Sequence, residues 1–118
     1  MNIKKLSLDE KIGQMLCFAF NGTEVNEQLK RLIKEEKIGS IIFFAKNIEN
    51  IKQAKSLTKA LQDMSDIPLF IGLDQEGGMV RRIVDDITYM PGAMSLAASN
   101  PNMIYEANYS LAQNLKFL

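Results

Sequence analysis

The sequence contains no histidine and a single cysteine among its 118 residues. Histidine is the commonest general acid or base near neutral pH, so acid–base chemistry has to come from carboxylates or from outside this chain. One cysteine cannot form an internal disulfide, which fits a reducing compartment. Cys17 lies in the apolar run "MLCFAF", where we expect a buried, unreactive thiol.

The chain also lacks an excess charge of either sign and a long apolar segment. Lysine plus arginine equals aspartate plus glutamate at 14 each, so no overall field attracts nucleic acid or an anionic membrane. Charged residues 9–11 interrupt the N-terminal segment that a signal peptide would need, and no apolar run approaches the length of a membrane span. We therefore expect a cytoplasmic globular protein whose partner is small or neutral, and neither nucleic acid nor a membrane.

Apolar periodicity predicts alternating strands and helices. Apolar runs at about 15–20, 40–44 and 69–73 predict three strands. In the last two runs, apolar residues do not alternate with polar ones, which is typical of strands that are buried on both faces. A capping box of Ser7 and Glu10 predicts a short first helix. The other expected helices run from Val25 through Ile33, from Ile51 to Met64, over 93–99, and from Pro101 with Asn100 as its cap.

The β-α-β-α-β order implies right-handed crossovers and a parallel sheet, in a doubly wound fold or a (β/α)8 barrel. Both folds place ligands at the carboxyl ends of the strands, so "FNGT", "FAKN" and "LDQEGG" are expected to face the same side. The sequence stops at Leu118 within a helical pattern, and a barrel usually needs about 250 residues. We expect residues 1–118 to be the front part of a larger barrel, ending before its fourth strand.

The stretch "GLDQEGGMVRR", residues 72–82, places two carboxylates, two glycines and two arginines where the third strand ends. Asp74 is the first polar residue after that strand, and one carboxylate can accept hydrogen bonds from two adjacent sugar hydroxyls. The glycine pair allows close backbone approach or positive φ, and Arg81 and Arg82 can pair with the acids or reach a ligand. Equally, the stretch can be an ordinary polar turn in which Glu76 pairs with an arginine.

Other chemistries for this stretch are less favoured. Asp74 and Glu76 could form the acid and nucleophile of a retaining glycosidase, about 5 Å apart, but residues on one loop rarely flank a bond from opposite sides. The same carboxylates could bind Mg²⁺, yet no further ligands are evident. The stretch matches neither common phosphate-binding glycine motif.

Four segments together resemble glycoside hydrolase family 3, and most resemble its bacterial β-N-acetylhexosaminidases: "DEKIGQML", "KIGSIIFFAKNI", "IPLFIGLDQEGGMVRRI" and "MPGAMSLAAS". The resemblance covers nearly the whole chain. It implies that the chain is the N-terminal part of a (β/α)8 barrel. It also implies an enzyme that removes terminal β-linked N-acetylglucosamine by a retaining mechanism, from muropeptides in cell-wall recycling or from chitooligosaccharides. It implies no metal or organic cofactor. By this resemblance Asp74 accepts hydrogen bonds from hydroxyls of the non-reducing sugar, and Arg82 is a second sugar contact.

Two departures from the family pattern qualify this resemblance. Met79 stands where the family usually has arginine, which leaves the local charge balance open, with Arg81 as a nearby cation. The nucleophilic aspartate and the acid/base histidine are expected downstream, so no catalytic residue is assigned to this chain. A β-glucosidase of the same family and a non-catalytic sugar-binding or assembly module remain alternatives. Open sheet edges also predict self-association of the 118-residue chain.

Overall fold

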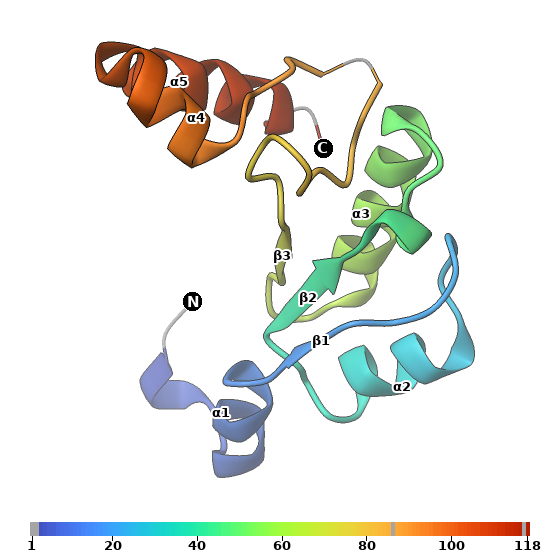
Figure 1. The fold of residues 1–118 in the computed structure, drawn as a ribbon. Helices are drawn as coiled ribbons and strands as arrows, with labels where there is room; N and C mark the ends of the chain where they lie inside the picture. Colours follow the sequence, from blue (N-terminus) through green and yellow to red (C-terminus); the bar gives the residue numbers. More distant parts are fainter. Residues whose placement is uncertain (1–2, 86, 117) are drawn as a thin grey trace.

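The computed structural model describes residues 3–85, 87–116 and 118 (Figure 1). The chain alternates helices with short strands and ends in two helices. The α-helices and strands are α1 (Leu8–Gln14), β1 (Cys17–Phe18), α2 (Glu27–Lys34), β2 (Ser40–Phe43), α3 (Ile51–Met64), β3 (Phe70–Leu73), α4 (Ala93–Ser99) and α5 (Ile104–Leu115). Short 3-10 turns cover Ile3–Lys5, Ala45–Asn47 and Pro101–Met103. The predicted β-α-β-α-β order is confirmed.

The strands form one parallel sheet in the order β1-β2-β3. The central strand β2 aligns its first residue, Ser40, with Cys17 of β1 and with Phe70 of β3. Right-handed crossovers between strands that follow one another in this order place α2 and α3 on the same face of the sheet. This is the winding of a barrel, since a doubly wound sheet reverses its strand order and carries helices on both faces.

Side chains from α2 and α3 bury one face of the sheet. Ile41 and Phe43 of β2 pack into the core with helix residues that recur every three or four positions. The helix residues that are buried in this core are Leu29 and Ile33 of α2, and Leu57 and Leu61 of α3. These are the apolar stripes that the sequence predicts.

Polar caps fix where the helices begin. The predicted capping box of α1 is confirmed, with Ser7 accepting from the N–H of Glu10 and the Glu10 carboxylate accepting from the N–H of Ser7. The side-chain oxygens of Asn26 and Asn50 cap α2 and α3. A cap of this kind stabilises a helix by about 1 kcal/mol.

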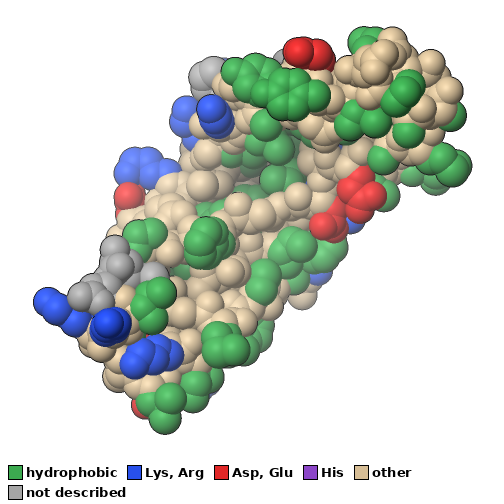
Figure 2. All heavy atoms as spheres, turned by 90° about the vertical axis from the view of Figure 1, so that its left-hand side faces the viewer, with side chains coloured by type: hydrophobic (Ala, Val, Ile, Leu, Met, Phe, Trp, Pro, Cys, Tyr) green, Lys and Arg blue, Asp and Glu red, His purple; other side chains and the backbone are tan. Residues whose placement is uncertain are grey.

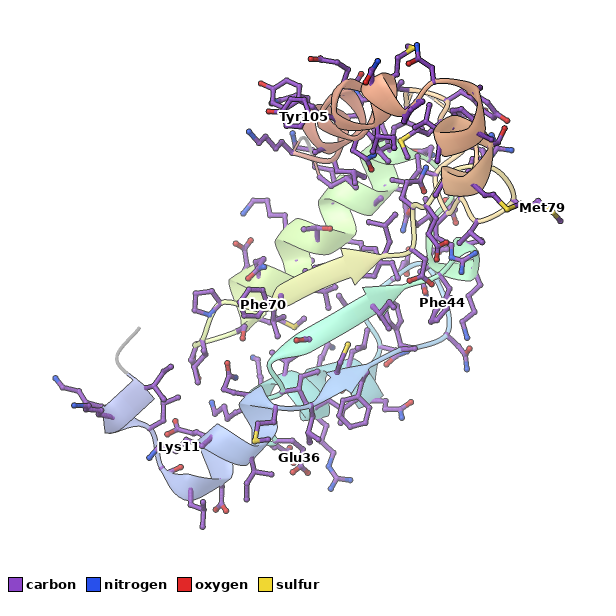
Figure 3. All side chains as sticks on the ribbon, turned by 60° about the vertical axis from the view of Figure 1, so that its left-hand side comes forward. Lys11, Glu36, Phe44, Phe70, Met79 and Tyr105 are labelled. Atoms are coloured by element: carbon purple, nitrogen blue, oxygen red, sulfur yellow. The ribbon has the colours of Figure 1, made fainter. Side chains whose placement is uncertain are left out.

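The opposite face of the sheet is not covered by any described residue. Phe70 is 78% exposed there and points away from α3 (Figure 3). Figure 2, which views the molecule from the left of Figure 1, shows hydrophobic side chains distributed along this side. Two expectations are wrong here. Cys17 is exposed, and neither β2 nor β3 is buried on both faces: β2 alternates half-buried with buried residues, and β3 alternates exposed with half-buried ones. Both were based on local apolarity, whereas burial requires a second layer that the described residues do not supply.

Helices α4 and α5 lie beyond the carboxyl ends of the strands (Figure 1). The predicted Asn100 cap is present, but it caps the 3-10 turn at Pro101, and the α-helix proper begins at Ile104. In α5, Leu111 is buried, whereas Ile104 at the start of the helix is exposed. The radius of gyration is 16.4 Å, against about 13.5 Å for a compact domain of this length. Within the described residues, no helix is both long and apolar enough to cross a membrane.

Candidate functional site

The ends of β1 and β2 are joined by Asn47. This side chain is 0% exposed, and its Nδ2 donates to the carbonyl oxygens of Phe20 (3.1 Å) and Gly22 (2.8 Å). Its Oδ1 accepts from the N–H of Phe44 at 2.8 Å. The segments "FNGT" and "FAKN" therefore lie side by side, as predicted from the strand order.

Other polar side chains in these two segments, or just after them, also bind one another. Lys46 Nζ donates to Asn21 Oδ1 at 2.6 Å, and Thr23 Oγ1 donates to Glu49 Oε1 at 3.0 Å. Each of these four groups thus has a partner within the protein. Their arrangement serves the loop structure and leaves the end of β3 as the stronger candidate for ligand contact.

At the end of β3, Asp74 forms an ion pair with Arg82. Arg82 Nη2 donates to Asp74 Oδ2 at 3.0 Å, and the two side chains are 22% (Arg82) and 40% (Asp74) exposed. The guanidinium also lies over the ring of Phe44, 5.4 Å from its centroid. Glu76 is exposed and makes no ion pair with a described residue, so the alternative in which it pairs with an arginine is not observed.

The amide of Gln75 holds the returning segment against the end of β3. Its Oε1 accepts from the backbone N–H groups of Arg82 (2.8 Å) and Ile83 (3.1 Å). Its Nε2 donates to the carbonyl oxygen of Ile83 at 2.8 Å. Because Ile83 is buried, this side chain fixes the backbone from which Arg82 projects.

The glycine pair makes the tight turn between Asp74 and Arg82. Gly77 has φ +87° and Gly78 has φ +57°, and the N–H of Gly78 donates to the carbonyl oxygen of Met90 at 2.8 Å. A Cβ on Gly77 would lie 2.5 Å from the carbonyl oxygen of Pro91. Of the two uses predicted for this pair, close backbone approach or positive φ, positive φ is observed at both glycines.

Met79 and Arg81 both lie away from the Asp74–Arg82 pair. The Met79 side chain is 100% exposed at the turn and points into solvent (Figure 3). The Arg81 guanidinium lies 4.9 Å from the centroid of the Tyr89 ring. Arg82 is thus the arginine that the fold brings to Asp74.

Arg82 retains hydrogen-bonding capacity. Its Nε is buried and has no hydrogen-bond partner among the described residues, while Asp74 Oδ1 accepts from none of them. A buried donor without an acceptor costs about 1–3 kcal/mol. A hydroxyl group, which both donates and accepts, complements such a pair.

The described side chains do not form a cluster of the kind that binds a metal ion. In the part of the chain that the structure describes, no three histidine, cysteine, aspartate or glutamate side chains are placed to hold a metal ion.

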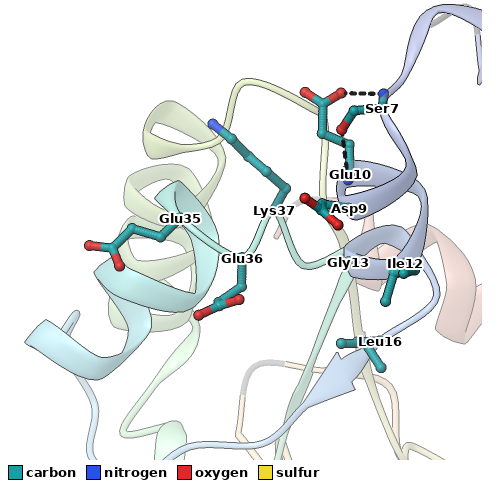
Figure 4. Close-up of a pocket in the computed structure, with 9 residues that line it drawn as sticks. All are labelled: Ser7, Asp9, Glu10, Ile12, Gly13, Leu16, Glu35, Glu36 and Lys37. Carbon is teal, nitrogen blue, oxygen red and sulfur yellow. Dashed lines mark hydrogen bonds between the residues drawn. The ribbon is translucent and has the colours of Figure 1, made fainter.

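A separate hollow of about 540 Å³ lies at the amino ends of the strands, between α1 and the segment after α2 (Figure 4). It includes the capping pair Ser7 and Glu10, and Glu36 and Lys37 lie on its other side. Ligands of parallel α/β folds bind at the opposite ends of the strands. This hollow is therefore not the candidate site.

The sequence does not assign individual roles to three residues of the site: Phe44, Asn47 and Gln75. Phe44 and Asn47 lie in "FAKN" and Gln75 lies in "LDQEGG", both predicted to end strands, but the sequence does not distinguish a buried amide from an exposed one. The one available signal was that each stands within a segment that ends a strand.

Residues 7–117 match the family model described as the glycosyl hydrolase family 3 N-terminal domain. The chain belongs to glycoside hydrolase family 3. The predicted fold class, the N-terminal part of a (β/α)8 barrel with parallel strands and flanking helices, is confirmed.

Individual relatives agree with the family assignment. A β-hexosaminidase of Psychromonas ingrahamii is 35% identical over 79 residues, which are 67% of this chain and 23% of that protein. The structure of a family 3 β-N-acetylglucosaminidase from Paenibacillus sp. str. FPU-7 matches 95% of this chain with a TM-score of 0.89 and 37% identity. NagZ from Neisseria gonorrhoeae, in complex with N-trifluoroacetyl-D-glucosamine, matches 86% with a TM-score of 0.69 and 27% identity. The chain spans 22% of the Paenibacillus protein and 32% of the Neisseria protein.

Proposed function

We propose that this chain forms part of the N-acetylglucosamine-binding subsite of a retaining β-N-acetylhexosaminidase. The substrates are terminal β-linked N-acetylglucosamine residues of muropeptides, as in cell-wall recycling, or of chitooligosaccharides. The observation that carries the proposal is the Asp74–Arg82 ion pair at the carboxyl end of β3, within the family motif. The names of the relatives support the sugar class, and one of them binds a glucosamine derivative.

Asp74 and Arg82 have complementary roles toward a sugar. Asp74 Oδ2 is engaged by Arg82, which orients the carboxylate and leaves Oδ1 to accept from sugar hydroxyls. Hydrogen bonds to a charged acceptor are roughly twice as strong as neutral ones. Arg82 offers its remaining Nη donors to hydroxyl oxygens of the same sugar, whereas its Nε is buried and out of a ligand's reach.

The bond-breaking groups are proposed to lie in the rest of a longer barrel, of which residues 1–118 are the front part. Retaining hydrolysis needs a nucleophile on one side of the anomeric carbon and a proton donor at the leaving oxygen. The chain has no histidine, and Asp74 and Glu76 share one loop. The cytoplasmic location stays a prediction.

The test compares the 118-residue chain with the full-length protein on chromogenic β-N-acetylglucosaminide and β-glucoside. We expect turnover by the full-length protein alone, with the N-acetylglucosaminide preferred. Preference for the glucoside would favour the β-glucosidase alternative, and sugar binding without turnover would favour a binding module. Turnover by the short chain that survives repurification and disappears in Glu76→Gln would overturn the proposal and support a local carboxylate pair.

A further inference from the structure

The Asp74–Arg82 pair is built from two segments that the side chain of Gln75 ties together next to the pair. The partners are eight positions apart, and the intervening chain turns through the two glycines. Gln75, the neighbour of Asp74, contacts the backbone of Arg82 and Ile83 through three hydrogen bonds of 2.8–3.1 Å. The end of β3 thereby holds both Asp74 and the backbone that carries Arg82.

No regular secondary structure supports this backbone. Residues 81–85 lie outside every described helix and strand. Among the described residues, the hydrogen bonds to the backbone groups of Arg82 and Ile83 come from Gln75. The Arg82 side chain is then held at its far end by Asp74 and on one side by Phe44. Removal of the Gln75 amide leaves the long Arg82 side chain on a backbone whose nearest remaining hydrogen bond to the segment after β3 is at Val80, where the carbonyl oxygen accepts from the N–H of Glu76 at 3.0 Å.

We propose that Gln75 is a positioning residue for sugar recognition, which acts by holding the backbone of Arg82 so that its guanidinium reaches Asp74. This inference rests on the proposed function, because it assumes that the Asp74–Arg82 pair contacts the sugar. Gln75 itself has its amide oxygen and nitrogen engaged by the protein, so it acts through Arg82 and not on the sugar. A misplacement of about 1 Å in a binding group can cost roughly a hundredfold in rate.

Gln62 provides a matched control. It is also a half-buried glutamine whose amide holds backbone beside β3, because its Oε1 accepts from the N–H of Leu69 (3.0 Å) and its Nε2 donates to the carbonyl oxygen of Leu69 (2.8 Å). Leu69 precedes β3, whereas Asp74 follows it. Gln62→Ala therefore removes the same kind of contact at the other end of the strand.

The experiment measures kcat/KM of the full-length protein on a chromogenic N-acetylglucosaminide. We expect Gln75→Ala to lose about ten- to a hundredfold, and Gln62→Ala to keep the wild-type value although it also lowers the melting temperature. Gln75→Glu retains an acceptor for the two N–H groups and should recover part of the loss. In an Arg82→Ala background, Gln75→Ala should cause no further loss, because residues that act through one another are not additive. An equal loss in Gln62→Ala, or full additivity with Arg82→Ala, would overturn the inference.

Crystal structures of the variants separate this inference from the proposed function. We expect the Arg82 guanidinium to leave Asp74 in Gln75→Ala and to stay paired in Gln62→Ala. A retained Asp74–Arg82 pair in Gln75→Ala contradicts the positioning role whatever the activity. If the wild-type protein turns over no N-acetylglucosaminide, the proposed function fails, and these structures still decide whether Gln75 positions Arg82.

Discussion

The guanidinium of Arg82 lies over the ring of Phe44, 5.4 Å from its centroid, although Phe44 follows β2 and Arg82 belongs to the segment after β3. A contact of this type contributes about 0.5–1 kcal/mol where water has access. It also leaves Asp74 and the open side of the guanidinium as the surfaces that a ligand can reach. Residues that follow β2 and β3 thus meet at the guanidinium of Arg82.

Asp74→Asn tests the proposed sugar contact in the full-length protein. The amide keeps the shape of the carboxylate but loses the charge and replaces one acceptor oxygen with a donor. Loss of a charge-assisted hydrogen bond weakens transition-state binding by about 1.5–3 kcal/mol, which is roughly a ten- to hundredfold fall in kcat/KM. Glu76→Gln is the control, because Glu76 is exposed and makes no ion pair with a described residue. An unchanged kcat/KM in Asp74→Asn would rule out the proposed role.

Gly77→Ala and Gly22→Ala separate backbone strain from steric overlap. Both glycines have positive φ, +87° and +97°, so alanine costs each roughly 1–2 kcal/mol. Only Gly77 has neighbours in the way: a Cβ there would lie 2.5 Å from the carbonyl oxygen of Pro91, whereas nothing lies within 4 Å at Gly22. We expect denaturant unfolding to show about 1–3 kcal/mol more destabilisation for Gly77→Ala. Equal losses of stability in the two variants would show that the turn at Gly77 shifts to accommodate the added Cβ at no extra cost.

The ion pair between Lys37 and Asp66 predicts a pH-dependent contribution to stability. Lys37 Nζ lies 2.6 Å from Asp66 Oδ2, and this hydrogen bond, with the lysine charge, lowers the pKa of Asp66 from 3.8. A carboxyl with a lowered pKa in the folded state stabilises the fold above its ordinary pKa, and this contribution is lost as the pH falls through the lowered value. We expect Asp66→Asn to lower the melting temperature slightly at pH 7, with a difference that disappears in strong acid and shrinks in high salt. Asp85→Asn, at an exposed aspartate without an ion pair to described residues, should show no such pattern.

The sequence determined the local structure better than it determined burial. The apolar spacing of α2 and α3 and the capping box at Ser7 depend on neighbours within one or two helical turns, and all three were confirmed. Cys17 and β3 were expected to be buried because their segments are apolar, but burial depends on what packs across the sheet. Gln75 could not be singled out for a similar reason. Its partners lie seven and eight positions away across a turn whose path depends on the glycine conformations.

The uncovered face of the sheet predicts that the 118-residue chain self-associates when produced alone. Phe70 is 78% exposed on this face, and among the described residues β3 pairs with β2 alone, so its outer edge has unpaired backbone groups. Unpaired strand edges beside an apolar surface favour association with other chains. We expect sedimentation velocity to show dimers or larger species whose population rises with concentration.

Phe70→Lys tests whether this face is the one that associates. A lysine at the edge of β3 removes apolar surface and adds a charge that opposes edge pairing, so the associated fraction should fall. Met79→Lys is the control, because Met79 is also apolar and highly exposed but lies in the turn after β3, away from the uncovered face. If both variants reduce association equally, the chains associate through exposed apolar side chains in general and not through the uncovered face of the sheet. A wild-type chain that stays monomeric at all concentrations and unfolds cooperatively would show that the open face does not drive association.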